Sequence, residues 1–518
     1  MKPFIFLYGP SGSGKSTIAP ILARSLDMST VDLDQLIVQE TGQEIPQIFE
    51  IAGEPAFRQY ERHALQQVLA GPSQVVSLGG GALQAAGNRD LVEAAGVVIC
   101  LSASVDVLIA RLQADVEERP LLAADLVENL EAMLQKRKEH YASFSYQLDT
   151  SELTLEQAAH EIQIMTGLFH ISGMGTGYPV QIGAGSLAEV DFLQIHTAYA
   201  IVSDENVSQY HLDPLLAAMN KTDVKAAPIV IPSGEQQKSI DTAVKLWEQF
   251  LQAGLDRKSA VLALGGGVVG DLTGFAAAAY MRGIAWVSAP TSLLAMVDSS
   301  LGGKTGVNLA FGKNLVGAFY PPEMVVIDPA LLETLPQAEL INGMAEVVKH
   351  GVIADPVLFE MCARPLETQD WEALVRRAAA VKIRVVNQDP YEQGLRETLN
   401  FGHTVGHAIE ALTHYGVKHG EAVAIGMVIE TRLAENLGTA ESGLTEQIIA
   451  VLEAVGLPTE LPASIEIDDL LVAMQSDKKK RAGRVRFSLP VKIGEAVWGV
   501  EVEDLKAALA KVYGGIYA

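Results

Sequence analysis

The stretch "FIFLYGPSGSGKST", residues 4–17, decides how the first part of the chain folds. Its first five residues are an apolar run of strand length, and the rest fits G-x-x-x-x-G-K-[ST] through Gly9, Gly14, Lys15 and Ser16. In this pattern the glycines let backbone N–H groups converge on phosphate oxygens, and the helix that follows adds its positive end. Lys15 would neutralise the phosphates and Ser16 would ligate Mg²⁺. We therefore expect a strand, a phosphate loop and a helix that together bind a nucleotide.

Length and composition set the outer limits. A chain of 518 residues is too long for one ordinary domain, so two or three hydrophobic cores are expected. Hydrophobic residues make up 49% and charged residues 19%, which is a globular composition. The net charge of −25 argues against a nucleic-acid partner, because such a surface repels phosphate backbones. Anionic substrates would need local clusters of Lys and Arg.

The two cysteines, Cys100 and Cys362, lie far apart and lack metal-type spacing. They cannot form a disulfide framework, and they suggest a reducing cytoplasm. The run "FIFLY" is too short for a signal-peptide core, and no apolar run is long enough to cross a membrane. A membrane partner is therefore not expected.

Apolar runs and helical patterns alternate along the chain, which predicts an α/β fold. "QVVSLGG" and "GVVICLSA" are further strands of the first domain, and a second series includes "HTAYAIVSDENV", "KAAPIVIPSGEQ", "AVLALGGGVVGD" and "IAWVSAPTSLL". Between the two series, from 165 to 186, the pattern loosens into glycines, and beyond Asp328 long helical patterns replace strands. We expect a P-loop domain at 1–165 with a parallel sheet, a linker at 166–174, a Rossmann-like α/β part at 175–325 and a mostly helical part at 326–518.

Three features follow the phosphate loop and suggest what accepts the phosphoryl group. "VDLDQLI" places Asp32 and Asp34 at a strand end, where one carboxylate can hold Mg²⁺ through water and the other a substrate hydroxyl. "FRQYERHAL" offers Arg58, whose planar fork suits a carboxylate, and "SLGGGAL" offers a turn (79–81) where backbone can approach a small ligand. Taken singly, each has a simpler reading: a helix cap, a solvated arginine and a plain turn.

Together, at these spacings after a P-loop, the features resemble shikimate kinase over nearly all of residues 1–165. The resemblance implies ATP-dependent phosphorylation of the 3-hydroxyl of shikimate, with Lys15, Asp34 and Arg119 in catalytic roles and Arg111 near the adenine. It implies Mg²⁺ at Ser16 and Asp32. The implied ATP-binding residues are Gly12, Ser13, Gly14, Lys15, Ser16, Thr17 and Arg119. The implied shikimate-binding residues are Asp34, Arg58, Gly79, Gly80, Gly81 and Arg137.

The second half carries another glycine-rich loop, "LALGGGVVGD" (262–271), at a strand end. It is not G-x-G-x-x-G in the ordinary register, so alone it is weak evidence for a dinucleotide. The next segment, "PTSLLAMVDSSLGGKTGVNLAFGKNLVGAFYPP" (290–322), is more informative, because it sets Lys304 and Lys313 among glycines and small residues. We expect these cations in turns around an anion pocket, which reconciles anionic substrates with the negative net charge.

The mostly apolar segment "LNFGHTVGHAIEAL" (399–412) contains two histidines, His403 and His407, which share a helix face. The pair can bind a metal, carry protons or only fill space beside a core. Together with His419 and Glu346 of "NGMAEVVKHGVI", the chain offers one carboxylate and two imidazoles, a set that suits Zn²⁺ with an open position. The pattern is not H-E-x-x-H, since Thr404 follows His403 and no glutamate stands ready as a protease base.

The blocks GEQxK, GGGVVGD, MVDSSLGGKTGVN, GKNLVGAFY, GMAEVVKHG and LNFGHTVGHAIE resemble 3-dehydroquinate synthase, from about Gly175 to Gly499. The resemblance implies NAD, Zn²⁺ or Co²⁺, and conversion of the seven-carbon acid phosphate DAHP to 3-dehydroquinate with loss of phosphate. It implies Glu346, His403 and His419 as metal ligands and His407 facing substrate. The implied catalytic residues are Asp298, Lys304, Asn314, Lys349 and His407. The implied DAHP contacts are Arg282, Asp298, Lys304, Asn314, Lys349, Lys382, Arg396, Asn400, His407 and Lys479, the last within a triplet (478–480) that leaves the register open. The implied NAD contacts are Asp204, Asn206, Glu235, Lys238, Gly266, Gly267, Asp271, Thr291, Ser292, Lys304, Lys313 and Thr334.

The two resemblances predict a bifunctional enzyme of aromatic (chorismate) biosynthesis that acts on small molecules, with a homodimer through the synthase part as a compatible assembly. Two alternatives stay open. The second half can be a sister sugar-phosphate cyclase, which shares fold, NAD and metal, although the Lys and Arg set favours the carboxylate of DAHP. The first half can be an inert binding module, which the intact P-loop argues against. The two reactions are not consecutive in the pathway, so the residues give no basis for channelling.

Overall fold

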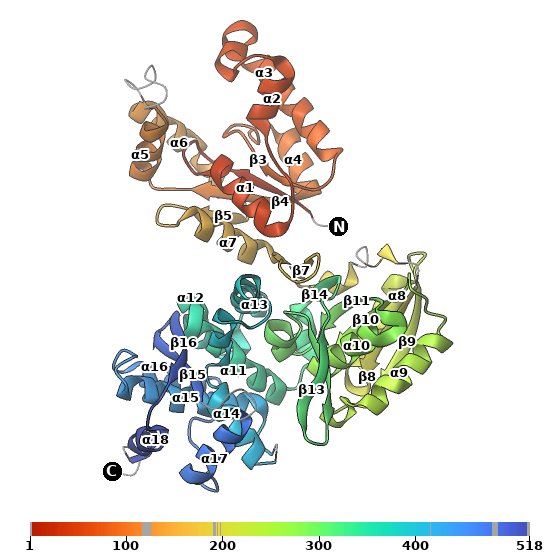
Figure 1. The fold of residues 1–518 in the computed structure, drawn as a ribbon. Helices are drawn as coiled ribbons and strands as arrows, with labels where there is room; N and C mark the ends of the chain where they lie inside the picture. The colour runs from red at the N-terminus through yellow and green to blue at the C-terminus, as the bar shows by residue number, and fades with distance from the viewer. Residues whose placement is uncertain are drawn as a thin grey trace. The chain divides into compact units, whose positions relative to one another are not determined.

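The computed structural model describes residues 3–116, 126–189, 193, 195–196, 198–414, 416–478 and 485–514. The chain divides into two compact units, Met1–Phe169 and His170–Ala518 (Figure 1). Within the described ranges, no helix has both the length and the apolar character needed to cross a membrane.

The first unit is built on a five-stranded parallel sheet of order β2-β3-β1-β4-β5. Its strands are β1 (Phe4–Tyr8), β2 (Thr30–Asp32), β3 (Val75–Ser77), β4 (Gly96–Ser102) and β5 (Tyr146–Asp149). Its helices are α1 (Lys15–Leu26), α2 (Leu33–Thr41), α3 (Ile45–Leu69), α4 (Ala86–Ala95), α5 (Val105–Val116), α6 (Leu126–Ala142) and α7 (Leu155–Thr166).

The alternation of side chains along β1 explains the two layers of helices. Phe4, Phe6 and Tyr8 point into a core that includes residues of α2 and α3. Ile5 and Leu7 point into a second core with residues of α1 and α7. Because both faces of the sheet are covered, every residue of β1 is buried and the strand is apolar throughout. The phosphate loop leaves β1 at its carboxyl end, the edge where parallel sheets place ligands.

A seven-stranded sheet of order β6-β7-β14-β11-β10-β8-β9 forms the framework of the second unit, and its pairings from β7 to β9 are parallel. Its strands are β6 (Leu168–Ile171), β7 (Tyr178–Ile182), β8 (Ala198–Asp204), β9 (Lys225–Ile231), β10 (Ala260–Gly265), β11 (Ala285–Pro290) and β14 (Met324–Ile327). The helices beside it are α8 (Glu205–Met219), α9 (Ile240–Gln252) and α10 (Gly267–Ala279).

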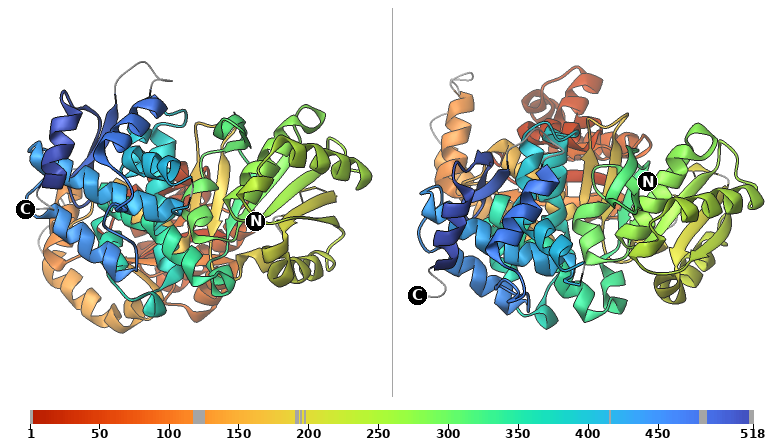
Figure 2. Two further views of the ribbon diagram at one scale, coloured as in Figure 1. Left: turned by 90° about the horizontal axis from the view of Figure 1, so that it is seen from below. Right: turned by 60° about the horizontal axis from the view of Figure 1, so that its bottom comes forward.

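Helices make up most of the chain beyond β14, and in Figures 1 and 2 they lie to one side of the seven-stranded sheet. They are α11 (Gln337–Ala354), α12 (Pro356–Cys362), α13 (Trp371–Gln388), α14 (His403–Leu412), α15 (His419–Asn436), α16 (Leu444–Ala454), α17 (Ile467–Lys478) and α18 (Leu505–Gly514). The predicted helical part is therefore observed. It also contains an antiparallel pair, β15 (Arg486–Lys492) and β16 (Glu495–Glu501), which the helical pattern did not predict.

An antiparallel ribbon, β12 (Lys304–Leu309) and β13 (Gly312–Phe319), occupies the segment where lysines were expected in turns. That expectation was wrong in part: Lys304 begins β12 and Lys313 lies on β13, close to the hairpin connection. The ribbon escaped prediction because β13 is exposed along nearly its whole length and so shows no alternation of buried and exposed positions. Residues 166–174, expected as a linker, include the end of α7 and all of β6.

The core of the second unit yields a stability prediction on α9. Leu246→Ala should destabilise the fold by about 2–5 kcal/mol, because Leu246 is fully buried against β8 and β10. Leu251→Ala on the same helix is the matched control and should change stability by less than about 0.5 kcal/mol, since that side chain is 65% exposed.

Urea unfolding followed by tryptophan fluorescence measures both variants. All 4 tryptophans lie in the second unit, so the signal reports that unit alone. Equal urea midpoints for the two variants would contradict the described packing of α9.

Candidate active sites

The phosphate loop of the first unit is closed and tightly bonded. The side chain of Lys15 is buried, and its Nζ donates to the carbonyls of Gly9 at 2.9 Å and Pro10 at 2.8 Å. A Cβ at Gly9, where φ is +136°, would lie 2.1 Å from the carbonyl oxygen of Leu101 in the adjacent strand, so only glycine fits. The loop's backbone thus holds the lysine at the start of α1, beside the positive end of the helix.

Asp32 contacts both the phosphate loop and the start of α2, where Asp34 lies. Its Oδ2 accepts from Ser16 Oγ at 2.7 Å, which puts together the two residues expected to serve Mg²⁺. Its Oδ1 accepts from the backbone N–H of Asp34 at 3.1 Å and of Gln35 at 3.2 Å, so it also caps α2. Asp32 can therefore cap α2 with one carboxylate oxygen and serve Mg²⁺ together with Ser16 through the other.

Asp34 and Arg58 lie against the glycine turn at 79–81. A Cβ at Gly79 would lie 2.9 Å from Asp34 Oδ1, and one at Gly81 would lie 2.7 Å from Arg58 Nη2. Arg58 is itself held by Glu61, whose buried carboxylate accepts from Nη1 at 2.7 Å. The carboxylate and the guanidinium therefore meet at a backbone surface without side chains, where a small ligand can approach both.

Helix α6 contributes a second cation to the same turn. Arg137 Nη1 donates to the carbonyl of Gly80 at 2.8 Å, and Tyr141 Oη donates to the same oxygen at 3.0 Å. Tyr8, at the end of β1, donates to it at 3.2 Å and contacts His140 Nε2 at 3.1 Å. Arg111 Nη1 lies beside the phosphate loop, 3.0 Å from Thr150 Oγ1 and 3.4 Å from the carbonyl of Gly12. Arg119 falls outside the described residues.

Burial shifts the pKa values of both Lys15 and Asp34. Burial lowers the pKa of Lys15 to about 8, against the opposing charges of Asp34 and Asp32. Burial, and then the charge of Asp32, raises the pKa of Asp34, against Lys15 and Arg58. A carboxylate with a raised pKa is suited to accept a proton from a hydroxyl.

In the second unit, a pocket opens where β10 and β11 end. The amide of Thr291 donates to the carbonyl of Gly265 at 3.0 Å, and a Cβ at Gly266 would lie 3.3 Å from Ser292 Oγ. The pocket is lined by Gly265, Gly266, Gly267, Gly270, Asp271, Trp286, Ser288, Pro290, Ala295, Ser299, Ser300, Gly303 and Lys304.

The other residues expected to hold NAD lie at strand ends and on the ribbon. Asp204 ends β8 and caps α8 by accepting from the backbone N–H of Asn206 at 2.8 Å. Lys238 forms an ion pair with Asp271. Glu235 Oε1 accepts from Asn308 on β12 at 2.7 Å, and Thr334 Oγ1 contacts His211 Nε2 at 2.7 Å. Of these residues, Asp271 lines the glycine pocket and brings Lys238 to it through their ion pair.

Asp298 is the meeting point of three cationic or imidazole side chains from α11 and α13. Its Oδ1 accepts from Lys382 Nζ at 2.7 Å and lies 4.0 Å from Lys349 Nζ and 3.9 Å from His350 Nε2. Burial alone would raise the pKa of Asp298, but Lys382 and Lys349 outweigh it and hold that pKa well below its usual range. Several expected substrate residues are therefore assembled by direct contact.

Another carboxylate, Glu392, lies between two further cations. It pairs with Lys304 and lies 4.0 Å from Arg396 Nε. Arg396 is almost fully buried, and a Cβ at Gly302 would lie 2.4 Å from its Nη2. Asn400 ends the 3-10 turn η9 (Leu395–Asn400), just before α14.

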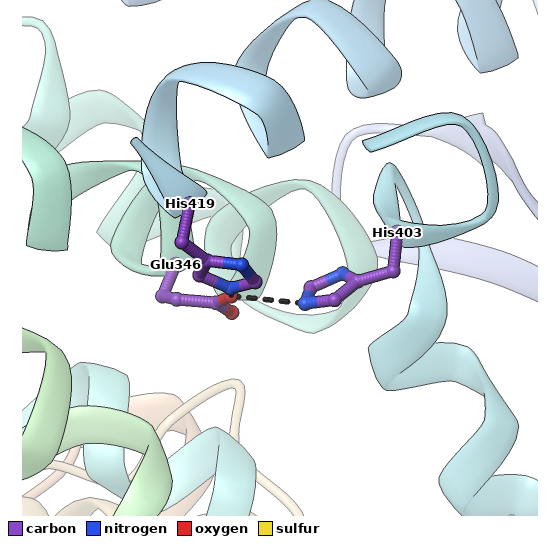
Figure 3. Close-up of side chains that lie close together, drawn as sticks. All are labelled: Glu346, His403 and His419. Atoms are coloured by element: carbon purple, nitrogen blue, oxygen red, sulfur yellow. Dashed lines mark hydrogen bonds and ion pairs between the residues drawn. The ribbon is translucent and has the colours of Figure 1, made fainter. Parts of the chain in front are cut away.

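A carboxylate and two imidazoles converge between α11, α14 and α15 (Figure 3). Glu346 Oε1 lies 3.1 Å from His403 Nε2 and 3.3 Å from His419 Nε2, and Glu346 Oε2 pairs with Lys349. One ligand atom from each of Glu346, His403 and His419 lies within 4.8 Å of the others. Burial would raise the pKa of Glu346, but Lys349 and His403 hold it well below its usual range, so the group stays ionised. Carboxylate oxygen and imidazole nitrogen are donors that Zn²⁺ and Co²⁺ accept.

Two expected residues lie apart from this assembly. Arg282 is exposed at the end of the turn η5 (Tyr280–Arg282), and in the described part of the chain no hydrogen bond or ion pair connects it with the cluster. Asn314, with φ of +56°, lies on the exposed ribbon and donates its backbone N–H to Asn308 Oδ1 at 2.9 Å. Lys479 falls outside the described residues.

Sequence reasoning missed several side chains that contact these groups, namely Tyr8, Glu61, Tyr141, Glu392 and Glu410. Glu61 follows Arg58 by three residues, which is a readable helical pair. Glu410 likewise shares a helix face with His403 and His407. Tyr141 follows Arg137 by four residues on α6, which is another readable helical pair, whereas Tyr8 reaches Gly80 across 72 residues and Glu392 lies in a loop without periodicity.

Comparison with known proteins identifies the families. The family model described as "3-dehydroquinate synthase N-terminal" matches residues 228–342, and "3-dehydroquinate synthase C-terminal" matches residues 343–480. The 3-dehydroquinate synthase of Rippkaea orientalis is 42% identical over 342 residues, which cover 64% of this chain and 93% of that protein. The chain belongs to the 3-dehydroquinate synthase family. The enzyme of Synechocystis sp. is 44% identical over 347 residues, covering 64% of this chain and 96% of that enzyme.

The "Shikimate kinase" family model matches residues 11–166, so the chain joins a shikimate kinase domain to a 3-dehydroquinate synthase domain. Solved structures extend the likeness of the second part. A 2-epi-5-epi-valiolone synthase from Streptomyces hygroscopicus, with NAD⁺ and Zn²⁺ bound, has a TM-score of 0.60 at 30% identity and covers 65% of this chain and 97% of its own. A 2-deoxy-scyllo-inosose synthase complexed with carbaglucose-6-phosphate, NAD⁺ and Co²⁺ has a TM-score of 0.61 at 26% identity and covers 67% and 98%.

The lowered pKa of Lys15 predicts how kinase activity depends on pH. Only the charged lysine neutralises phosphate, so kcat/KM for MgATP should fall as the pH rises through about 8. Lys15→Arg should be slower at every pH, but it should lose this alkaline limb because a guanidinium stays charged. If kcat/KM fell at the same pH in wild type and in Lys15→Arg, the titrating group would be a residue other than Lys15.

Proposed function

We propose that this chain catalyses two reactions of the shikimate pathway at separate sites: ATP-dependent phosphorylation of the 3-hydroxyl of shikimate, and conversion of DAHP to 3-dehydroquinate with loss of phosphate. The observation that carries the first is the meeting of Asp34, Arg58 and Arg137 at one glycine turn beside the phosphate loop. The observation that carries the second is the buried set of Glu346, His403 and His419.

In the kinase site, positioning and charge do most of the work that phosphoryl transfer needs. Arg58 and Arg137 suit the carboxylate of shikimate and the glycine turn suits its ring. Asp34, with its raised pKa, would take the proton of the 3-hydroxyl as that oxygen attacks the γ-phosphate. Lys15 and the backbone of the phosphate loop would hold the phosphates, with Mg²⁺ at Ser16 and Asp32.

In the synthase site, the cations suit a substrate that carries both a carboxylate and a phosphate. Lys304, Lys382 and Arg396 are already paired with Glu392 or Asp298, so these carboxylates would give way or share when an anion arrives. Asp298 and Lys349, in contact range of each other, are suited to hold the substrate's hydroxyls and to move protons. His407 lies on the same helix face as His403, where it can contact a substrate.

The donor set of Glu346, His403 and His419 fits a divalent metal, and the glycine-lined pocket with Asp271 fits a dinucleotide. Solved relatives at 26–30% identity contain NAD⁺ together with Zn²⁺ or Co²⁺, which supports both assignments. When bound, NAD would take up and return a hydride at C5 of the substrate and the metal would polarise the C5 oxygen.

A sister sugar-phosphate cyclase is the second candidate for the synthase part, since two solved relatives belong to that class. The relatives at 42–44% identity, however, are 3-dehydroquinate synthases, and the lysine and arginine set suits a carboxylate. Two observations argue against the alternative that the kinase half is an inert binding module: Ser16 is hydrogen-bonded to Asp32, and Lys15 is buried in the phosphate loop.

The remaining assignments belong to the same proposal. The domain boundaries are 1–165, 166–174, 175–325 and 326–518. The enzyme is cytoplasmic, which the two free, buried cysteines support. It forms a homodimer through the synthase part, for which the exposed apolar side chains of the ribbon, Phe311 among them at 90% exposure, are a suitable surface.

Separate sites predict separable losses of activity. Lys15→Ala should lower kinase turnover by about three orders of magnitude, since an essential phosphate cation is removed. The same variant should keep the rate of phosphate release from DAHP within about two-fold of wild type. Turnover assays of both reactions on one preparation test this, and a parallel loss of both activities would contradict independent sites.

The metal assignment predicts different results for the two histidines of α14. His403→Ala should hold about ten-fold less zinc per chain than wild type, because a ligand is lost. His407→Ala should keep its zinc but lose phosphate release. Atomic absorption after gel filtration measures the metal. Full zinc content in His403→Ala, or lost zinc in His407→Ala, would move the site toward the second group of donors, His407, Glu410 and His419.

A further inference from the structure

A second carboxylate lies behind the proposed metal ligands. Glu410 is 5% exposed, three residues beyond His407 on α14. Its Oε2 lies 3.1 Å from His419 Nδ1, and its Oε1 lies 3.3 Å from Lys313 Nζ on the ribbon strand β13. A buried carboxylate is costly unless it is paired, and here both oxygens have partners.

The imidazole of His419 is held at both nitrogens. Nδ1 faces Glu410 and Nε2 faces Glu346, at 3.1 Å and 3.3 Å. A neutral imidazole carries one N–H and one lone pair, and a metal needs the lone pair. If Nδ1–H is donated to Glu410, the lone pair is left on Nε2, the nitrogen that shares a space with Glu346 and His403.

We infer that Glu410 is a positioning residue of the metal site: it accepts the Nδ1 proton of His419, and so fixes the ring and the tautomer that present Nε2 to the metal. The inference rests on the metal assignment proposed above. A carboxylate behind a ligating histidine typically raises metal affinity by 10–100-fold, because the ring is held in its binding orientation and its basicity rises.

Helix α14 carries both a proposed metal ligand, His403, and Glu410, the carboxylate that contacts a second ligand. His403, His407 and Glu410 occur at i, i+4 and i+7 of one helical face, so all three point toward the start of α15, where His419 lies. Lys313 compensates the charge of Glu410 from the ribbon, but its side chain is 36% exposed, so the ion pair is screened. His419, not Lys313, is therefore the partner that gives the carboxylate its function.

The test is the affinity of the full-length protein for Zn²⁺, measured by competition with a chromogenic chelator. Glu410→Gln keeps the shape and one acceptor but loses the charge, and its affinity should fall by about ten-fold; Glu410→Ala loses both, and its affinity should fall by about a hundred-fold. Lys313→Gln should stay within about three-fold of wild type, since it removes the screened ion pair with Glu410 and leaves the contact between Glu410 and His419 in place.

Glu421→Gln is the matched control. Glu421 lies two residues from His419 and caps α15 by accepting from the Lys418 backbone N–H at 3.0 Å, which a glutamine also does. The control loses the same charge two residues from His419 and should bind Zn²⁺ as wild type does. Urea midpoints of the metal-free proteins check that each variant folds.

Bound Co²⁺ gives a readout that a purely structural role would not change. Its visible absorption reports the number and geometry of ligands, so Glu410→Gln should keep the band intensity of wild type with a shifted position. A collapse of the band would make Glu410 a ligand and overturn the inference, as would unchanged Zn²⁺ affinity in both Glu410 variants or an equal loss in Lys313→Gln. Wild-type protein that binds no Zn²⁺ would overturn the metal assignment and this inference with it.

Discussion

The carboxylate of Glu346, only 1% exposed, imposes the constraint on which the synthase centre depends. An ionised group at that depth costs several kcal/mol unless opposite charges and hydrogen-bond donors surround it. Lys349 from the same helix, His403 from α14 and His419 from α15 meet that need. Three helices are therefore held together by one buried charge, and the groups that hold it are also the donors that a divalent metal requires.

The same principle explains how a strongly acidic chain can act on anionic substrates. Its cations are paired in advance with carboxylates of the chain: Lys382 with Asp298, Lys304 with Glu392, and Arg58 with Glu61. Each pair keeps a cation ordered and partly buried at a cost lower than that of an unpaired charge. A substrate carboxylate or phosphate can then replace or share a partner at a local site, whatever the field of the whole surface.

The inner strands of both sheets could be predicted because they follow from apolar runs of strand length, whereas β6 and β7 lie in the glycine-rich stretch 165–186, which shows no clear period. The fully apolar run of β1 and the glycines after β1 and β10 carry their structure locally. The ribbon β12–β13 could not be predicted in this way, because a solvent-exposed strand such as "GKNLVGAF" has no buried face and therefore no alternation of apolar and polar residues. The position of Glu392 could not be predicted from periodicity either. It depends on a positive φ of +57° and on a loop in which the backbone N–H groups of Gln393 and Gly394 donate to the Asp389 carboxylate. Arg137 reaches Gly80 across 57 residues, so only the family resemblance pointed to it.

The most direct test is phosphate release from DAHP by wild-type protein with NAD present, measured with and without a chelator while the product is identified. The account predicts release that stops with the chelator, returns with Zn²⁺ or Co²⁺, and yields 3-dehydroquinate. Folded, metal-loaded protein that releases no phosphate, or that releases it with equal speed in the chelator, would contradict the assignment of the buried carboxylate and its two histidines as a catalytic metal site.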